Sequence, residues 1–358
     1  MMDDALKRDW LDGSPRPRGA SVDEVSALTL NAVYVIGSAS AFGSRLVPSE
    51  EVDHAFGMPS GKLKSRAGIH SFAHAAENED EGSLGEDACR KALHNSHAQA
   101  ENLDWIVAAS ETHHAYPSLS AILHGRLGLR ENCNALDVGS GCLALLQAFA
   151  VAQALFLSGR AKKILVATAD VHSRTLGPGR AKGEFGGLFG DGASAFLLAA
   201  KPRDTSKGIA YRLGEFFFGC AAKYAEAIAV SDAGGGKLEV LFDGDALSRA
   251  AVNRMEKVIN EVEHRSGISR ESVGAFATHQ PNPRLVTLLA KQIGVSAKHF
   301  PPISATRGNL GSSMCGAALH EAFQDAATQP ADERKPVFLA SLGPGLLFGG
   351  GWMVPAGA

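Results

Sequence analysis

The chain has 358 residues, a length typical of about two domains. Its composition is 45% hydrophobic and 20% charged, which excludes a disordered chain, and the net charge of −3 excludes a basic nucleic-acid-binding surface. The five cysteines contain no Cys-x-x-Cys pair, which argues against a disulfide framework or a zinc ribbon and favours a reducing compartment, the cytoplasm.

The first 30 residues form a segment of mixed charge that contains proline and glycine. They lack the apolar centre of a signal peptide, so we expect residues 1–30 to be an N-terminal extension outside the fold. The longest apolar run, residues 144–157, is shorter than the roughly 18 residues of a transmembrane helix. We therefore expect neither a membrane nor a nucleic acid as a partner.

Strand and helix patterns alternate through the first half of the chain. Strands are predicted at residues 32–42, 104–110 and 162–170, and helices at 116–129 and 142–159. The helix at 142–159 is apolar on nearly all sides, which is typical of a buried helix. This order favours an α/β fold in which helices cover the faces of a sheet.

The second half repeats this plan. Residues 274–295 resemble 104–129, and residues 308–323 resemble 139–149, in each case with the same sequence of strand, turn and helix features. Residues 336–345 and 348–356 likewise resemble 162–170 and 189–199. We therefore predict two duplicated α/β subdomains, at 31–200 and 208–358, joined by residues 201–208. Residues 220–250 carry no clear periodic pattern.

Cys142 is the first candidate for catalysis. It follows the turn Gly139-Ser140-Gly141 and opens the predicted helix at 142–159. A thiol at a helix N-terminus faces the positive end of the helix dipole, which is expected to lower its pKa and favour the nucleophilic thiolate. The alternative is a buried structural cysteine, as we expect for the other four.

His279 and Asn309 are further candidates. His279 ends a predicted strand and begins a proline-rich loop, and Asn309 lies in the glycine-rich turn before a buried helix. Either residue alone also fits a structural role, as a hydrogen-bonded core histidine or a turn asparagine. Metal binding by the paired histidines of the chain is disfavoured, because no cysteine or carboxylate partners accompany them.

Several motifs, in order along residues 31–356, resemble the thiolase-fold condensing enzymes and most closely the β-ketoacyl-acyl-carrier-protein synthase III group. The motifs are Ser65-Arg66-Ala67-Gly68-Ile69, Ala115-Tyr116-Pro117-Ser118, Leu136-Asp137-Val138 leading to Cys142, Phe189-Gly190-Asp191-Gly192-Ala193, His279-Gln280-Pro281-Asn282, Gly308-Asn309 and Gly343-Pro344-Gly345. The resemblance implies a thiolase fold with five αβαβα layers, and a homodimer.

The resemblance also implies a mechanism. Cys142 would take an acyl group from an acyl-CoA, and the backbone N–H groups of Cys142 and Gly345 would stabilise the oxyanion. His279 and Asn309 would then stabilise the enolate that forms when a malonyl-thioester, carried by CoA or by an acyl carrier protein, loses carbon dioxide. No metal or redox cofactor is implied.

The chain departs from the family pattern at several positions. Gly141 replaces the usual alanine, and Pro344, which lacks an N–H, interrupts the glycine-rich oxyanion loop. Glu111 corresponds to the acid–base glutamate of the hydroxymethylglutaryl-CoA synthase branch, so a condensation without decarboxylation is an alternative. These departures favour specialised metabolism.

Other readings stay open beside condensation. Acyl transfer to an alcohol or amine would need Cys142 and His279 but not Asn309, and a non-catalytic partner subunit would need none of the three. Arg66, Arg174 and Arg180 are weaker candidates for binding the substrate, through coenzyme phosphates or a carrier protein, with ordinary surface positions as the alternative.

Overall fold

The computed structural model describes residues 32–204, 208–222, 228–235, 237–242 and 244–357. The predicted extension at 1–30 and part of the predicted junction at 201–208 lie outside these residues. The account below concerns the compact unit Val33–Ala358. Among the described residues, none of the helices combines the length and the hydropathy that a membrane crossing requires.

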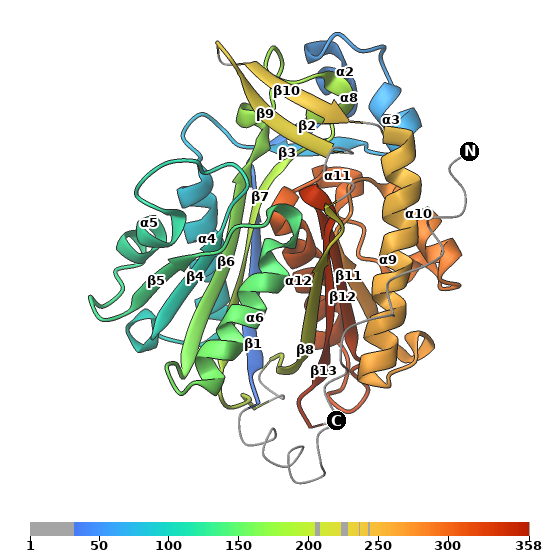
Figure 1. Ribbon diagram of the computed structural model, residues 1–358. Coiled ribbons are helices and arrows are strands. Elements are labelled where there is room, and N and C mark those ends of the chain that lie inside the picture. Colours follow the sequence, from blue (N-terminus) through green and yellow to red (C-terminus); the bar gives the residue numbers. More distant parts are fainter. Residues whose placement is uncertain (1–31, 205–207, 223–227, 236, 243, 358) are drawn as a thin grey trace. The chain divides into compact units, whose positions relative to one another are not determined.

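A nine-stranded mixed sheet runs through the unit in the order β11-β12-β13-β8-β1-β7-β6-β4-β5 (Figure 1). Five strands come from the first half of the chain: β1 (Tyr34–Phe42), β4 (Trp105–Ala109), β5 (Asn134–Asp137), β6 (Lys163–Val171) and β7 (Asp191–Ala199). Four come from the second half: β8 (Tyr211–Cys220), β11 (Ala275–Thr278), β12 (Val337–Gly343) and β13 (Leu347–Pro355).

The two halves of the sheet repeat one pairing scheme. In the first half β4 is parallel to β6, β6 is antiparallel to β7, and β7 is antiparallel to β1. In the second half β11 is parallel to β12, β12 is antiparallel to β13, and β13 is antiparallel to β8. The two halves meet where β1 pairs with β8. The matched order is what a duplicated α/β unit produces.

Helices cover both halves and fill the space between them. Helices α4 (Glu81–Ser96) and α5 (Leu119–Arg126) pack on the first half, and α9 (Gly244–Ser266) and α10 (Pro283–Gln292) on the second. Helices α6 (Ala144–Leu157) and α12 (Met314–Ala327) lie between the halves (Figure 1). This is the predicted α/β fold with alternating helical and sheet layers.

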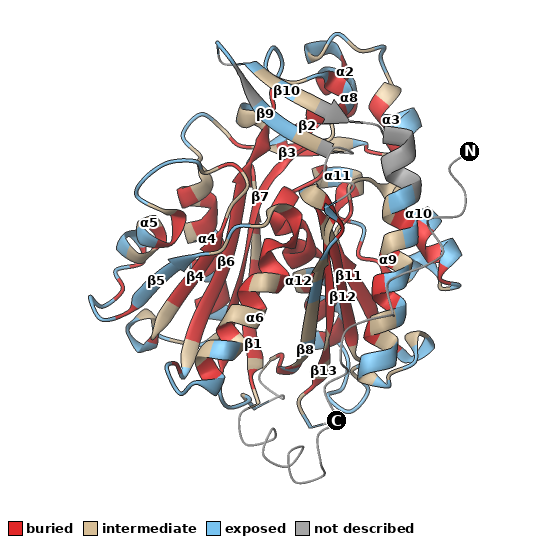
Figure 2. Ribbon diagram, viewed as in Figure 1, coloured by how far each residue is buried: buried red, intermediate tan, exposed pale blue. Residues whose placement is uncertain are grey.

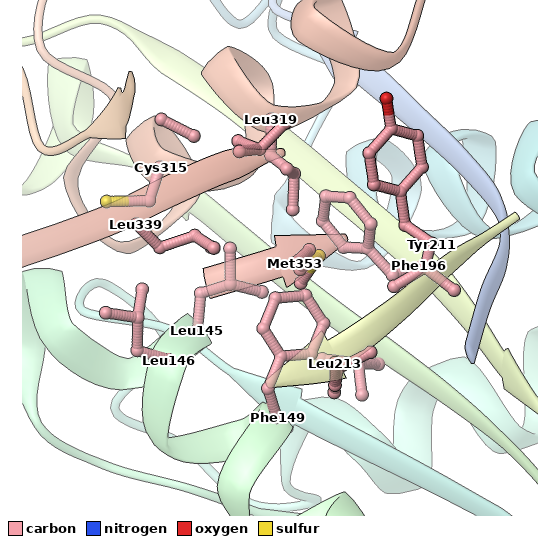
Figure 3. Packing of buried hydrophobic residues seen from close by; sticks show 14 of the residues in the cluster. Leu145, Leu146, Phe149, Phe196, Tyr211, Leu213, Cys315, Leu319, Leu339 and Met353 are labelled. Atoms are coloured by element: carbon pink, nitrogen blue, oxygen red, sulfur yellow. The ribbon is translucent and has the colours of Figure 1, made fainter. Parts of the chain in front are cut away.

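Three apolar clusters separate these layers, and Figure 2 shows buried residues along the strands and the inner helices. The central cluster joins α6, α12 and strands of both halves, and its side chains are seen in Figure 3, among them Leu145, Phe149, Phe196 and Leu339. Gly316 of α12 lies so close to β7 that an added Cβ would be 1.9 Å from Ser194 Oγ. A glycine is therefore needed for this close packing.

The remaining elements are short and lie mostly near one end of the sheet (Figure 1). They are β2 (Arg45–Pro48), α2 (Ser49–Ala55), α3 (Lys62–Ala67), β3 (Ser71–His74), α7 (His172–Thr175), α8 (Gly183–Gly186), β9 (Ile228–Gly234), β10 (Lys237–Phe242) and α11 (Ser304–Arg307).

Two predicted helices begin later than the sequence pattern indicates. The helix predicted at 116–129 begins at Leu119, where the Asp137 carboxylate accepts hydrogen bonds from the N–H groups of Leu119 (3.0 Å) and Ser120 (2.9 Å). The helix predicted at 142–159 begins at Ala144, because Cys142 lies in a 3₁₀ turn, Gly141–Leu143. The region without a clear pattern, 220–250, contains the β9–β10 hairpin and the start of α9.

Candidate active site

A cavity of about 720 Å³ lies where the ends of both duplicated halves meet. Cys142, His279 and Asn309 all line it, although they are separated by up to 167 residues in the sequence. Cys142 precedes α6 in the first half, whereas His279 and Asn309 follow β11 and precede α12 in the second. The duplication therefore brings the three predicted side chains to one cavity.

The turn that carries Cys142 is held from the second half. Gly141 has a φ of 58°, and an added Cβ would lie 3.0 Å from Pro344 Cδ, so glycine is required there. Ser341 Oγ donates a hydrogen bond of 2.7 Å to the Cys142 carbonyl. These contacts fix the position of the sulfur at the cavity.

The environment of the Cys142 thiol differs from the one predicted. We expected the helix N-terminus to lower its pKa, but burial raises the pKa well above the ordinary value, and the neighbouring Glu111 carboxylate raises it further. The expectation was wrong because it considered only the helix dipole and not the desolvation of the thiolate or the charge beside it. The thiol therefore needs a proton acceptor when it reacts.

His279 lies at the end of β11, where its backbone N–H donates to the Ala340 carbonyl at 3.0 Å. Burial lowers the pKa of His279 to about 4, so the imidazole is neutral near pH 7. Its Nδ1 is buried and has no hydrogen-bond partner among the described residues. The side chain is therefore a neutral imidazole facing the cavity.

Asn309 is fixed through its backbone and its side-chain oxygen. Its backbone N–H donates to the Leu188 carbonyl and its backbone carbonyl accepts from the Gly190 N–H, each at 2.9 Å. Asn309 Oδ1 accepts from the N–H of Gly311 at 3.1 Å. Among the described residues the amide nitrogen has no hydrogen-bond partner, so it is available to a ligand in the cavity.

Glu111 also lines this cavity. Its N–H donates to Asp170 Oδ1 at 2.6 Å, and its Oε2 lies 3.4 Å from His172 Nε2. Burial acts to raise the pKa of Glu111, but hydrogen bonding and charge interactions with His172, and hydrogen bonding to the Cys142 thiol, outweigh burial and lower it. The carboxylate is therefore ionised beside the predicted nucleophile.

The sequence reasoning missed two residues of this network, Asp170 and His172. Asp170 is fully buried and accepts hydrogen bonds from Ser110 Oγ, from Glu111 N and from both N–H and Oγ of Ser312. Burial raises the pKa of Asp170 to about 6. The available signal was the end of the strand predicted at 162–170, where an aspartate is followed two residues later by a histidine.

Of the three weaker candidates, one arginine lines the cavity and two do not. Arg180 lines the cavity, whereas Arg174 donates to the Ala76 carbonyl and Arg66 is exposed on α3. At the oxyanion loop, Gly343, Pro344 and Leu346 line the cavity, and Gly345 is not among the lining residues. An added Cβ on Gly343 would lie 3.7 Å from Cys142 N, so Gly343 is the loop glycine near the nucleophile.

No group of three or more His, Cys, Asp or Glu side chains placed to hold a metal ion occurs in the described ranges.

Comparisons with known proteins identify relatives of one family. Residues 136–215 match the 3-oxoacyl-[acyl-carrier-protein] synthase III family, and residues 264–353 match its C-terminal counterpart. The β-ketoacyl-[acyl-carrier-protein] synthase III of Escherichia coli K12 is 25% identical over 320 residues, covering 88% of this chain and 97% of the relative. The enzyme of the same name from Serratia proteamaculans is 28% identical over 288 residues, covering 80% and 88%.

Solved structures share the fold. The 3-oxoacyl-(acyl carrier protein) synthase III of Pseudomonas aeruginosa has a TM-score of 0.79 and 22% identity, and covers 90% of this chain and 98% of its own. A variant of Xanthomonas campestris OleA, with bound lauric acid and lauroyl-CoA, has a TM-score of 0.78 and 19% identity, and covers 91% and 99%. The chain is a β-ketoacyl-acyl-carrier-protein synthase III-like condensing enzyme of the thiolase superfamily, and thus an acyltransferase.

Proposed function

We propose that Cys142 takes the acyl group of an acyl-thioester and that a malonyl-thioester then condenses with this acyl-enzyme. The observation that carries the proposal is the meeting of Cys142, His279 and Asn309 in one cavity of about 720 Å³. In loading, the sulfur attacks the thioester carbonyl, and the Cys142 N–H with a backbone N–H of the 343–345 loop stabilises the oxyanion. Pro344 has no N–H, so the second donor is a glycine of this loop.

The second step needs two neutral hydrogen-bond donors. The neutral imidazole of His279 and the free amide of Asn309 are of the type that stabilises the enolate oxygen as the malonyl group loses carbon dioxide. The enolate carbon attacks the acyl-Cys142 carbonyl and releases a β-ketoacyl product. The chemistry requires no metal or redox cofactor.

The substrates in this proposal are an acyl-CoA and a malonyl group carried by CoA or by an acyl carrier protein. Because Arg180 lines the cavity and is exposed, we infer that it is the arginine that binds a coenzyme phosphate. The departures at Glu111 and Pro344 favour a specialised acyl substrate, including polyketide-type substrates. The five cysteines are unpaired, which supports a cytoplasmic location.

The experiment is a condensation assay on acyl-loaded enzyme. Malonyl-CoA or malonyl-carrier protein is added, and carbon dioxide and the β-ketoacyl product are measured for wild type and for Asn309→Ala. We expect equimolar release of both from wild type and a loss of about 10²-fold or more in the variant, as for removal of one oxyanion donor. Consumption of the acyl-enzyme only when an alcohol or amine is supplied would contradict the proposal.

A second candidate function rests on Glu111. Its ionised carboxylate lies at the nucleophile and inside the cavity, where it suits a base that removes a proton from the α-carbon of an acyl-thioester donor. Condensation would then proceed without loss of carbon dioxide, as the hydroxymethylglutaryl-CoA synthase resemblance implies. A product formed from two simple acyl-CoAs, abolished by Glu111→Gln, would establish this route in place of the first.

We also propose a homodimer formed through β5. This strand lies at one edge of the nine-stranded sheet, and all four of its residues are exposed. An open edge strand offers unpaired N–H and C=O groups to a second chain. A second copy of β5 would extend the sheet across the dimer.

A further inference from the structure

His172 is held in one orientation next to Glu111. Its ring stacks on Phe189 with 4.5 Å between centroids and 26° between planes. On Gly311, an added Cβ would lie 2.2 Å from His172 Cε1, so the backbone of this glycine touches the ring. With the ring held in this way, His172 Nε2 lies 3.4 Å from Glu111 Oε2.

The pair is enclosed. The side chains of His172 and Glu111 are 3% and 15% exposed, and both residues line the cavity that holds Cys142. His172 Nδ1 and Glu111 Oε1 are buried and have no conventional hydrogen-bond partner among the described residues. Unsatisfied polar atoms of this kind, at a cavity, indicate groups that act on a ligand or exchange protons.

The charged groups around His172 are mostly carboxylates. Glu111 faces it from the loop after β4, Asp170 from β6 and Asp191 from the start of β7. Glu111 is also faced by Asp170, by the Cys142 thiol and by His279 at the end of β11, and burial keeps His279 neutral. Burial acts to lower the pKa of His172, but these carboxylates outweigh burial and raise it.

We propose that His172 is a positioning residue that keeps the Glu111 carboxylate ionised beside the Cys142 thiol, so that Glu111 accepts the thiol proton during acyl loading. The inference rests on the proposed function, since it supplies the proton acceptor that the buried thiol needs. A carboxylate alone in this apolar cavity would protonate, and the imidazolium opposes that.

The proton step is balanced within the site. As the Cys142 sulfur attacks the acyl-thioester carbonyl, the S–H bond breaks, an O–H bond forms on Glu111 and a new S–C bond forms. The C–S bond of the thioester then breaks, and the leaving thiolate takes the proton from Glu111. The products are the acyl-enzyme and a free thiol, with Glu111 again ionised and His172 unchanged.

The first test needs no substrate. Histidine carrying ¹³C in its ring is incorporated into the full chain, and the His172 signal is identified by its loss in His172→Gln. Its titration is then followed by NMR in wild type and in Glu111→Gln. We expect the midpoint to fall by about 1–3 pH units when the carboxylate charge is removed. An unchanged midpoint would show that the Glu111 carboxylate does not act on His172, and would overturn the inference.

The second test follows acyl loading of Cys142 against pH by mass spectrometry. His172→Gln keeps an N–H donor but no charge. In this variant we expect the acidic limb of the pH profile of the loading rate to shift to higher pH by about 1–3 units, because Glu111 protonates more readily. In Glu111→Gln this limb should disappear. A limb that stays in place in both variants would overturn the inference.

The matched control is His320→Asn. His320 is another substantially buried histidine, hydrogen-bonded through Nδ1 to Ser38 Oγ at 2.9 Å. Its loss should lower stability and leave the acidic limb unchanged. Wild type that forms no acyl adduct would refute the proposed function, while the NMR titration would still decide on the charged pair.

Discussion

The neutrality of His279 leads to a prediction about stability against pH. Burial lowers the pKa of His279 from 6.5 to about 4, a difference of about 2.5. Between these two values the unfolded chain binds a proton that the folded chain does not. Stability is therefore fully present above about pH 6.5 and is lost as the pH falls toward 4.

The size of this effect follows from the two pKa values. At about 1.36 kcal/mol for each pKa unit, the unfolding free energy is lower by about 3.4 kcal/mol below pH 4 than above about pH 6.5. At about pH 5, linkage gives a loss of about 2 kcal/mol relative to about pH 7.5. In His279→Gln this contribution is absent, whereas the contributions of the carboxylates and of His320 are common to both proteins.

The assay is urea unfolding of wild type and His279→Gln at about pH 7.5 and about pH 5. Between the two pH values, wild type should lose about 2 kcal/mol more unfolding free energy than the variant. Equal losses would show that His279 titrates normally in the folded protein. That result would refute the neutral imidazole on which the enolate-stabilising role depends.

Three further outcomes follow from the structure. Removing the carboxylate that raises the Cys142 pKa, in Glu111→Gln, should move the midpoint of Cys142 thiolate formation to lower pH, followed by ultraviolet absorbance against Cys142→Ala; an unchanged or higher midpoint would contradict this electrostatic effect. Gly316→Ala should destabilise the chain by about 1–3 kcal/mol in thermal unfolding, because the new Cβ meets Ser194; unchanged stability would mean that the central layer readjusts. Ala135→Pro should convert the proposed dimer to a monomer in light scattering, since the neighbouring Asn134 N–H donates to the Asp104 carbonyl, next to β4, at 2.9 Å and the Ala135 N–H alternates outward; a dimer that persists would place the interface elsewhere.

Much of the fold could be predicted from the sequence because hydrophobic periodicity is local. The strands at 32–42, 104–110 and 162–170 and the repeated plan of the second half all appear in the structure. The start of α6 was misplaced, since nothing in the residues at 142–144 separates a 3₁₀ turn from a first helical turn. The hairpin β9–β10 gave no usable pattern, and the subdomain boundaries remain predictions.

The candidate site was only partly predictable. Cys142, His279 and Asn309 could be selected because each occupies a turn at the end of an element. The raised pKa of the Cys142 thiol could not be inferred, since it depends on burial and on a carboxylate 31 positions away in the sequence. His172 was missed for the same reason, because its partner Glu111 is adjacent only in the folded chain.

The measurement that tests the central claim most directly is intact-protein mass spectrometry after incubation with a panel of acyl-CoAs. Wild type and Cys142→Ala are compared, and the modified peptide is sequenced. The account predicts a gain of one acyl group on Cys142 with at least one donor, and no gain in Cys142→Ala. An acyl group that is retained in Cys142→Ala, or no adduct with any acyl-CoA or acyl-carrier protein, would contradict it.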